Sequence, residues 1–390
     1  MNVGIDLISF YTPQYFLDLN VLAKERGVDP DKFTIGIGQE KMAIPPPDED
    51  IVTMAASAAH PILENVGREN IEILLFATES GIDQSKAAAM FLHGLLKLPT
   101  RCRAVELKQA CYGATAGLHL AAASVAVRPG TRALIVGSDI ARYDLRSPGE
   151  PTQGAGAVAL LVTVNPRVLA LDPETGLYAE DVMDFWRPNY RDEALVDGKY
   201  SMRVYLAAME ECWKQYAALT GRHFHDIARY CYHLPFTRMA EKAHIRLAKF
   251  AALKELTGEE LETEIGDSLR YNRITGNTYS ASLYEGLTSL LDHAGEDLSG
   301  QRIGLFSYGS GCMGEYFSGV AQPGYGQHLF TTAHRAMLEG RTPLTYRQYE
   351  DIFQLGFPTD GGDHAFAQYR TGPYRLSGVS QHKRLYERVL

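Results

Sequence analysis

The chain has 390 residues, 45% of them hydrophobic and 22% charged, which is typical of a globular protein that can bury a large core. Its formal net charge of −9 argues against a general nucleic-acid-binding or membrane-surface protein, because such proteins usually present a basic face. The five cysteines are odd in number and form neither a CxxC pair nor a zinc-like cluster, so we expect a reduced, cytoplasmic protein.

In the first half of the chain, predicted strands alternate with predicted helices. Residues 2–10 follow the pattern of a strand, and nothing in this N-terminal sequence predicts a signal peptide. Residues 51–66 form an amphipathic helical pattern preceded by Asp48 and Asp50, and acids favour a helix N-terminus. Residues 71–78 are an apolar run that predicts a strand buried on both faces. Similar patterns predict strands at 103–107, 132–138, 154–164 and 170–172, and helices at 21–26 and 85–96.

The most apolar stretch of the chain covers residues 111–127. It is shorter than the roughly 20 residues that a membrane-spanning helix needs. It is also rich in alanine and interrupted by Tyr112 and His119. A helix that is apolar all round is more simply explained as one buried inside a large protein.

The second half repeats this alternation more loosely. The patterns predict helices at 200–219, 237–250 and 279–293, and strands at 227–233, 302–308 and from Met313 onward. Strands that alternate with helices indicate α/β layers around a mainly parallel or mixed sheet. The segments ALIVGSD and IGLFSYGSG are alike in kind, which favours a duplicated architecture. The polar tail from Gln327 is expected to form helices and loops on the surface.

Cys111 is a candidate nucleophile because it ends a loop-like segment and opens the apolar helix. Unpaired N–H groups and the positive dipole end at a helix start lower a thiol pKa and favour the thiolate. Gly113 would leave room for a substrate. On placement alone, a buried structural cysteine is the commoner interpretation, and we expect it for the other four cysteines.

Glu79 and His233 each follow or end a predicted strand. Glu79 stands where α/β sheets place ligand chemistry, and partial burial would raise its pKa and suit it to proton transfer. A helix cap or a solvated loop acid is the alternative. Pro235 restricts Leu234 to an extended or turn geometry, so His233 is expected to extend from a rigid strand end. It could also be one of the many histidines without a catalytic role.

Three further polar features lie at predicted turns. The glycine-rich turn at 309–311 could bring backbone N–H groups to a ligand or be a plain hairpin turn. Asn277 precedes a helix, where it could cap, bind substrate, or both. Asp139 and Asp184 stand at or after strand ends, where position alone favours structural salt bridges.

Ten segments, in this order and over nearly the whole chain, resemble the bacterial-type 3-hydroxy-3-methylglutaryl-CoA synthases of the thiolase superfamily. They are GID, FTIGIGQEKMAIP, FATESGIDQSKAAA, ACYGATAGL, SDIARY, GEPTQGAGAVALL, EDVMDFWRP, YHLPFTRM, YNRITGNTYSASLY and LFSYGSGCMGEYF. The region after Gln327 matches this family only in general character. The resemblance implies a thiolase-like, five-layered αβαβα fold of two duplicated halves, residues 1–166 and 167–390, and a homodimer.

The resemblance also implies a role for each matched residue. Cys111 corresponds to the acylated nucleophile, Glu79 to the general acid/base and His233 to the residue that orients the acetoacetyl thioester. Further matches are Tyr112, Asn277, Gly309 and Ser310 at the substrate pocket, and Asp139 and Asp184 as supporting acids. Because coenzyme A has an anionic end, cations are expected at the pocket mouth, with Lys242, Arg238 and Lys32 as candidates.

The implied reaction joins acetyl-CoA, acetoacetyl-CoA and water into 3-hydroxy-3-methylglutaryl-CoA and CoA through an acetyl-Cys111 thioester. The resemblance places this reaction in the mevalonate pathway. The enzyme is expected to use neither a cofactor nor a metal, and to bind neither nucleic acid nor a membrane. Related synthases of polyketide β-branching share the catalytic residues but take substrates on acyl carrier proteins, so that alternative stays open. A non-catalytic scaffold would be unexpected with all three catalytic residues retained.

Overall fold

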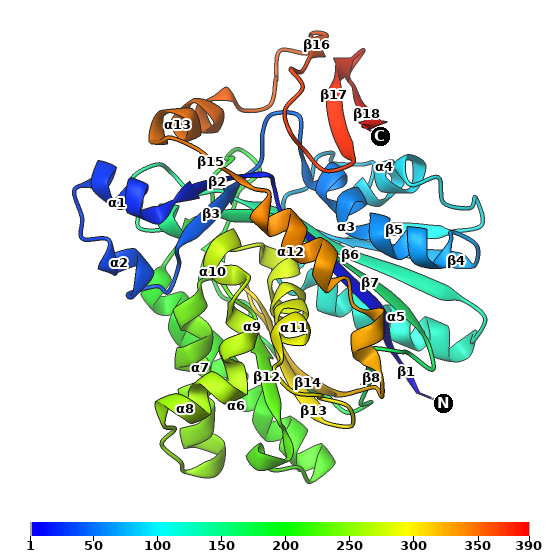
Figure 1. The fold of residues 1–390 in the computed structure, drawn as a ribbon, viewed down its shortest axis with the longest axis vertical. Helices are drawn as coiled ribbons and strands as arrows, with labels where there is room; N and C mark the ends of the chain where they lie inside the picture. Colours follow the sequence, from blue (N-terminus) through cyan, green and yellow to red (C-terminus); the bar gives the residue numbers. More distant parts are fainter. Residues whose placement is uncertain (1, 390) are drawn as a thin grey trace.

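The computed structural model describes residues 2–389 and arranges them as five layers, helix, sheet, helix, sheet and helix (Figure 1). Both sheet layers are covered on both faces, which is why their strands are nearly continuous apolar runs in the sequence. The predicted α/β class is therefore confirmed.

The sheet of the first half places three strand ends at one edge. β1 (Val3–Tyr11) runs antiparallel to β7 (Gly154–Val164), which runs antiparallel to β6 (Arg132–Ala141). β4 (Ile71–Ala77) lies parallel to both β6 and β5 (Arg103–Leu107). Residues that follow β4, β5 and β6 in the chain therefore meet at the same edge of the sheet.

The sheet layer of the second half is joined by hydrogen bonds to that of the first through β8. β8 (Leu169–Leu171) pairs with β1 and with β14 (Met313–Ala321), and β13 (Arg302–Gly309) forms a hairpin with β14. β12 (Arg229–Tyr232) lies parallel to β13, and β9 (Gly176–Ala179) pairs with β14. The result is a ten-stranded mixed sheet in the order β12-β13-β14-β8-β1-β7-β6-β4-β5, with β9 beside β14.

The central layer consists of α5 (Gly113–Val127) and α11 (Ser282–His293). Leu118 of α5 and Leu287 of α11 belong to one buried cluster with residues of β4, β6 and β13, so the two helices are enclosed by both sheet halves. The outer layers are α3 (Ile51–Val66) and α4 (Ala88–Leu95) on the first half, and α6 (Gly198–Thr220) and α7 (Thr237–Ala252) on the second.

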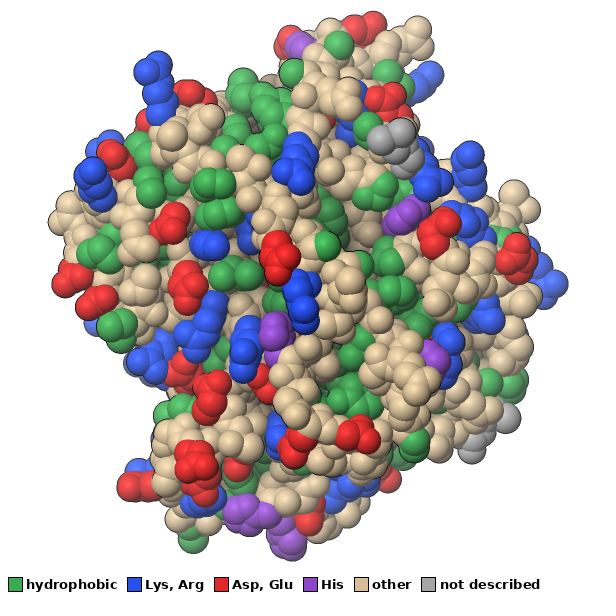
Figure 2. All heavy atoms as spheres, viewed as in Figure 1, with side chains coloured by type: hydrophobic (Ala, Val, Ile, Leu, Met, Phe, Trp, Pro, Cys, Tyr) green, Lys and Arg blue, Asp and Glu red, His purple; other side chains and the backbone are tan. Residues whose placement is uncertain are grey.

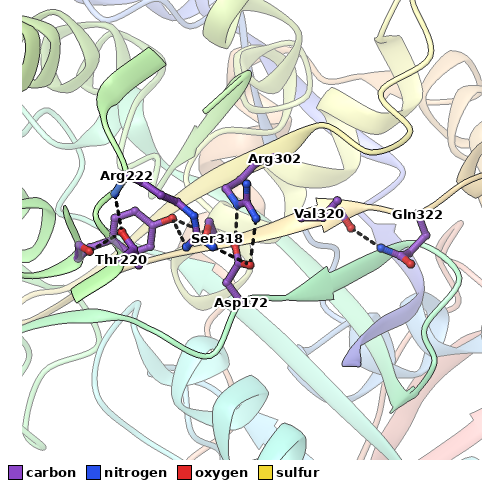
Figure 3. A network of polar contacts seen from close by, with 8 residues as sticks. Asp172, Thr220, Arg222, Arg302, Ser318, Val320 and Gln322 are labelled. Atoms are coloured by element: carbon purple, nitrogen blue, oxygen red, sulfur yellow. Dashed lines mark hydrogen bonds and ion pairs between the residues drawn. The ribbon is translucent and has the colours of Figure 1, made fainter. Parts of the chain in front are cut away.

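Asp172, directly after β8, ties the strands of the second half together (Figure 3). Its carboxylate accepts hydrogen bonds from Arg302 of β13, at 2.8 Å, and from Ser318 of β14, while Arg222 lies 3.4 Å away. Burial opposes ionisation of Asp172, but the bonds from Arg302 and Ser318 outweigh it and lower the pKa. The charged cluster therefore fixes β8 against β13 and β14.

Shorter elements surround these layers. The other helices among the described residues are α1 (Leu19–Arg26), α2 (Asp31–Thr34), α8 (Gly258–Leu261), α9 (Asp267–Leu269), α10 (Asn272–Thr275), α12 (Thr331–Glu339) and α13 (Tyr346–Leu355). The other strands there are β2 (Tyr15–Asp18), β3 (Lys41–Ile44), β10 (Phe185–Trp186), β11 (Leu195–Val196), β15 (Thr342–Pro343), β16 (His364–Ala365), β17 (Tyr374–Ser380) and β18 (Lys383–Arg388).

The helix expected from residue 111 differs from the prediction in two ways. It begins at Gly113, and it is not buried all round, because Leu120 and Val127 are 54% and 82% exposed. Among residues 2–389, the stretch Ala110–Val127 is the one that is long and apolar enough to cross a membrane. Its helix packs between the sheet halves here, and a core helix can satisfy the same criterion.

The tail after Gln327 also differs from the prediction. Besides helices it contains the small sheet β16-β17-β18, which lies beside α3 and α4 (Figure 1). Tyr374, Arg375 and Leu376 of β17 are buried, and Arg375 pairs with the buried Asp48 at 3.0 Å. The buried Arg375 has its polar partner Asp48 far away in the chain. A pattern of apolar residues could therefore not predict this small sheet.

Candidate active site

A cavity of about 440 Å³ takes residues from both halves of the molecule. Cys111 comes from the first half, and His233, Asn277 and Ser310 come from the second. Most of the remaining wall is apolar or aromatic, including Tyr143, Phe185, Leu195, Val196, Met202, Tyr205, Phe236, Met239, Tyr279 and Tyr308. Such a lining suits a ligand with a long, partly apolar arm. A second cavity of about 270 Å³, beneath α13, contains none of the predicted site residues.

Cys111 lies in the turn between β5 and α5, one residue before the helix cap Tyr112. Its thiol does not behave as the sequence predicts. Burial, followed by the charge and hydrogen bond of Glu79, raises the pKa of Cys111 well above the usual thiol value. The helix start does not compensate for these two effects. The resting thiol is therefore protonated, and it needs a base to become a nucleophile.

That base is in contact with the thiol. The Cys111 Sγ–H group donates to Glu79 Oε1 across 3.1 Å. Burial raises the pKa of Glu79 to about 8, and the Asp139 carboxylate adds to this, while Cys111 and Arg187 oppose it. The expectation that burial would raise this pKa is confirmed. A carboxyl group that titrates near neutral pH can both accept and return a proton.

Asp139, fully buried in β6, holds the backbone that carries Glu79. Its Oδ1 atom accepts from the N–H groups of Glu79 and Ser80, at 2.8 and 3.0 Å, and from the Thr78 hydroxyl at 2.8 Å. Its Oδ2 atom accepts from the Ser280 N–H group at 3.0 Å. These partners are neutral, so the position-based expectation of a salt bridge is wrong for Asp139. Asp139 supports the backbone that carries the Glu79 carboxyl group and does not line the cavity.

His233 directly follows β12, as expected, and its side chain reaches the cavity. Its N–H group donates to the Phe306 carbonyl at 2.8 Å, and its carbonyl accepts from the Tyr205 hydroxyl at 2.9 Å. The ring nitrogen Nδ1 lies 2.5 Å from the Ser282 hydroxyl. Burial lowers the pKa of His233 to about 3, so the imidazole is neutral at physiological pH.

Asn277 and Ser310 line the cavity, where the sequence places them. Asn277 is buried, and its Oδ1 atom accepts from the Tyr279 N–H group at 2.9 Å. This bond closes a tight turn ahead of the 3₁₀ turn Tyr279–Ala281, but the cap residues there and at α11 are Thr278 and Ala281, so Asn277 faces the cavity and is not a helix cap. Ser310 belongs to the turn of the β13-β14 hairpin. The glycine-rich turn is therefore a hairpin turn and part of the cavity wall at once.

Gly309 and Tyr112 do not line the cavity, contrary to their predicted place. A Cβ atom at Gly309 would lie 2.5 Å from the Gln109 carbonyl oxygen and 2.7 Å from Tyr112 Cβ. Glycine is thus needed to let the cysteine loop approach β13. The Tyr112 hydroxyl donates to the buried Glu315 carboxylate at 2.6 Å. Both residues fix the loop that carries the nucleophile.

Asp184 supports the opposite wall and is likewise outside the cavity lining. It is fully buried and accepts from the Gly311 N–H group at 2.9 Å, the Tyr308 hydroxyl at 2.8 Å and the Ser201 hydroxyl at 2.9 Å. Its partners are neutral, so the expected salt bridge is wrong here too. The N–H group of Gly311 is occupied by this carboxylate.

The three cations proposed for the cavity mouth differ, and Lys32, exposed on α2, does not line the cavity. Lys242 is exposed, and its Nζ atom lies 4.0 Å from Met202 Sδ and 5.6 Å from the Phe236 ring centre. Since both neighbours line the cavity, Lys242 stands at its rim. Arg238 instead pairs with Glu241 in the same helix and does not line the cavity.

The sequence did not single out three residues that contact the catalytic groups. The Arg187 guanidinium donates to the Glu79 carbonyl, Ser282 contacts His233, and Tyr205 packs beside His233. Arg187 and Ser282 lie in the FWRP and YSASLY segments, which belong to the family resemblance, and this position in the sequence is the signal that could have identified them. Tyr205 stands within a long helix and has no local signal.

The arrangement brings together three chemical abilities. A protonated thiol touches a carboxyl group that titrates near neutral pH, which is the pairing that covalent catalysis needs. A neutral imidazole faces the same cavity and can donate or accept one hydrogen bond. The site can therefore carry an acyl group on sulfur and move a proton beside it.

Comparisons with known proteins point to one family. The model of the hydroxymethylglutaryl-coenzyme A synthase N-terminal region matches residues 1–167, and that of the C-terminal region matches residues 169–250 and 248–356. The boundary between residues 166 and 167 remains a prediction.

Individual relatives agree with these matches. The chain is 46% identical to hydroxymethylglutaryl-CoA synthase of Enterococcus faecalis over 92% of this chain and 94% of the relative. It is 35% identical to the polyketide biosynthesis 3-hydroxy-3-methylglutaryl-ACP synthase PksG of Bacillus subtilis over 91% of this chain and 88% of the relative. A crystal structure of an HMG-CoA synthase complexed with CoA superposes with a TM-score of 0.95 at 40% identity, covering 100% of both chains. The predicted thiolase-like fold is confirmed by this neighbour.

Proposed function

The chain belongs to the hydroxymethylglutaryl-coenzyme A synthase family, and from this membership we propose that it condenses acetyl-CoA, acetoacetyl-CoA and water into 3-hydroxy-3-methylglutaryl-CoA and CoA. The observation that carries the proposal is the 3.1 Å contact between Cys111 Sγ and Glu79 Oε1, in a site whose cavity also receives His233. The reaction needs a sulfur nucleophile, a base beside the acyl group it carries, and a second substrate held against both.

The first step loads the enzyme. The Cys111 thiol, protonated at rest, gives its proton to Glu79 along their hydrogen bond. The thiolate attacks the carbonyl carbon of acetyl-CoA, the bond to the CoA sulfur breaks, and CoA leaves as a thiol after taking up a proton. The acetyl group is then a thioester on Cys111, and Glu79 is again a base. This covalent step predicts ping-pong kinetics.

The second step forms the carbon–carbon bond. Glu79 removes a proton from the methyl group of the acetyl thioester, and the thioester carbonyl takes up the electron pair as an enolate. The methyl carbon attacks the ketone carbonyl of acetoacetyl-CoA. The neutral His233 donates a hydrogen bond to that ketone oxygen as negative charge develops there, and the proton held by Glu79 neutralises the alkoxide.

The third step returns the free enzyme. Water attacks the thioester carbonyl, the bond to Cys111 Sγ breaks, and the product leaves while the sulfur is protonated. The N–H group of Gly311 is bound to Asp184, so the backbone N–H groups of Cys111 and Ser310 are the proposed oxyanion donors for these steps. Removing one such donor typically costs about 10²–10³ in rate.

Free CoA thioesters are the proposed substrates, with carrier-bound acyl groups as the alternative. Identity is higher to the Enterococcus faecalis CoA enzyme, 46%, than to the Bacillus subtilis ACP enzyme, 35%. An acidic carrier protein would favour a positively charged docking surface around the cavity mouth. On the face seen in Figure 2, cationic and anionic side chains are interspersed. Lys242 at the cavity rim is a single cation that could pair with the anionic end of one CoA molecule, which favours a free CoA thioester.

We also infer a homodimer in the cytoplasm, acting in the mevalonate pathway, with halves at 1–166 and 167–390. β5 is the outer strand of its sheet and Val105 on it is 39% exposed. The neighbouring α5 exposes Leu120 and Val127. An open strand edge beside an apolar helix face suits pairing with a second copy. Five free cysteines suit a reducing compartment.

A single assay tests the proposed function. Purified protein is given acetyl-CoA and acetoacetyl-CoA, CoA release is followed, and the product mass is determined. Formation of 3-hydroxy-3-methylglutaryl-CoA is the expected result, and CoA release without that product would contradict the proposal. Replacing each thioester in turn by its carrier-bound form, at equal concentration, compares the two substrate classes through kcat/KM.

A further inference from the structure

The ring of His233 has a single polar contact within the described residues 2–389. Its backbone is fixed at both ends, by the Phe306 carbonyl and the Tyr205 hydroxyl, and neither bond constrains the ring's protonation. Among residues 2–389, the one side chain hydrogen-bonded to the imidazole is Ser282, whose Oγ atom lies 2.5 Å from Nδ1. Ser282 therefore decides which ring nitrogen carries the hydrogen.

The surroundings of Ser282 favour one direction for that bond. Its Oγ atom accepts from the Leu234 N–H group at 3.2 Å, and a backbone N–H group can only donate. Ser282 is 1% exposed and is the first residue of α11, and its hydroxyl makes no bond to a carbonyl of the 3₁₀ turn Tyr279–Ala281 that precedes the helix in the described part of the chain. Nδ1 of His233 is the one acceptor that the described residues offer it.

Two assignments can then be compared. If Nδ1 carried the hydrogen, it would donate to Oγ, and the buried Ser282 hydroxyl hydrogen would have no acceptor. If Nδ1 is bare, Ser282 donates to it and every buried hydrogen in the group is paired. Burial keeps the ring neutral, so one nitrogen must be bare and the other must be a donor.

We propose that Ser282 is a positioning residue that holds His233 in the tautomer with hydrogen on Nε2, so that a fixed N–H donor faces the cavity. The proposal rests on the proposed function for the identity of the acceptor, which is the ketone oxygen of acetoacetyl-CoA. The opposite tautomer would present a lone pair to the developing negative charge and repel it. Ser282 thus acts through His233 and not on the substrate.

The direct test is spectroscopic and needs no substrate. Full-length protein labelled with ¹⁵N-histidine is examined by long-range proton–nitrogen correlation, with His233→Gln used to assign the His233 signals. The expected wild-type spectrum has Nδ1 in the unprotonated range and Nε2 in the protonated range. In Ser282→Ala the two nitrogens should move toward averaged values, and Ser282→Thr, which keeps a hydroxyl, should restore the wild-type pattern. A wild-type ring with hydrogen on Nδ1 would overturn the assignment.

Kinetics provide the second readout. Ser282→Ala should raise KM for acetoacetyl-CoA or lower kcat for condensation by roughly tenfold, an amount comparable to one hydrogen bond, while acetylation of Cys111 by acetyl-CoA keeps its rate. Ser289→Ala, on the same helix and bonded to Tyr271 and Asp267, is the matched control and should leave the His233 signals unchanged. Unchanged spectra and kinetics in Ser282→Ala would reject the proposal. A wild-type protein with the expected tautomer that forms no condensation product would instead overturn the proposed function and leave the tautomer assignment standing.

Discussion

The Sγ–H group of Cys111 donates a hydrogen bond to the Oε1 atom of Glu79 across 3.1 Å. Burial raises the pKa of both groups, the Glu79 charge raises that of Cys111 further, and the hydrogen bond from Cys111 partly offsets the rise at Glu79. The pair therefore carries at most one charge near neutral pH, and that charge can sit on sulfur or on oxygen as the reaction requires. Nucleophile and base form one coupled unit.

Replacing the sulfur should separate covalent loading from binding. In Cys111→Ser, labelled acetyl-CoA should give no stable label on the protein, because a hydroxyl group is a far weaker nucleophile than a thiol beside the same base. Gel electrophoresis with radiolabelled acetyl-CoA measures this. Cys102→Ser is the control, since burial raises the pKa of Cys102 to about 11 and, in the described part of the chain, no carboxylate accepts a hydrogen bond from its thiol. Persistent label in the Cys111 variant would refute its role as nucleophile.

Removing the carboxyl group should affect condensation most. Glu79→Ala should still become acetylated, although more slowly because the thiol loses its proton acceptor, and should lose about 10²–10⁴ in condensation rate. Single-turnover measurements of protein acetylation and product formation distinguish the two steps. Condensation at the wild-type rate would mean that another group is the acid/base.

The pH dependence of condensation follows from two pKa shifts. Glu79, with a pKa of about 8, must be ionised to act as a base, so the rate should rise with pH through about 8. His233, with a pKa of about 3, stays neutral across the working range and should add no inflection near pH 6 to 7. The pH profile of condensation in acetylated enzyme checks both, and in Glu79→Gln the rise near pH 8 should disappear. An inflection near 6.5 that vanishes in His233→Gln would contradict the neutral ring.

His233 itself should matter for the second substrate. His233→Ala should weaken the use of acetoacetyl-CoA, by roughly tenfold or more in kcat/KM, because a donor at the ketone oxygen is lost. Acetylation of Cys111 should continue. Unchanged kcat and KM for acetoacetyl-CoA would exclude this role.

Gly309 should tolerate no side chain. In Gly309→Ala the new Cβ would lie 2.5 Å from the Gln109 carbonyl oxygen, so the cysteine loop must shift. We expect a loss of about 1–3 kcal/mol in stability, typical of overpacking, together with slower acetylation. Gly94→Ala in α4 is the control, since a Cβ there meets nothing within 4 Å. Thermal unfolding and the acetylation rate are the measurements, and an equal response of both variants would contradict the packing explanation.

Most of the core layers could be read from the sequence because their signals are local. The apolar run at 71–78 and the capped helix at 51–66 both follow from residues within one or two turns, including the Asp50 cap that accepts from Val52 and Thr53. The small sheet near the C-terminus could not be read in this way, because the buried Arg375 pairs with Asp48, more than 300 positions away.

The sequence alone supplied the candidates for the chemistry. Glu79 and Cys111 follow the parallel strands β4 and β5, whose ends meet at one edge of the sheet, and the family pattern adds His233, which follows β12 in the other half. Only the tertiary structure decided their protonation. The helix start at Cys111 predicted a low thiol pKa, but enclosure and the Glu79 carboxyl group reverse it, and Ser282 sets the ring of His233. Ionisation depends on burial and on charges from distant segments, and neither is encoded in a local pattern.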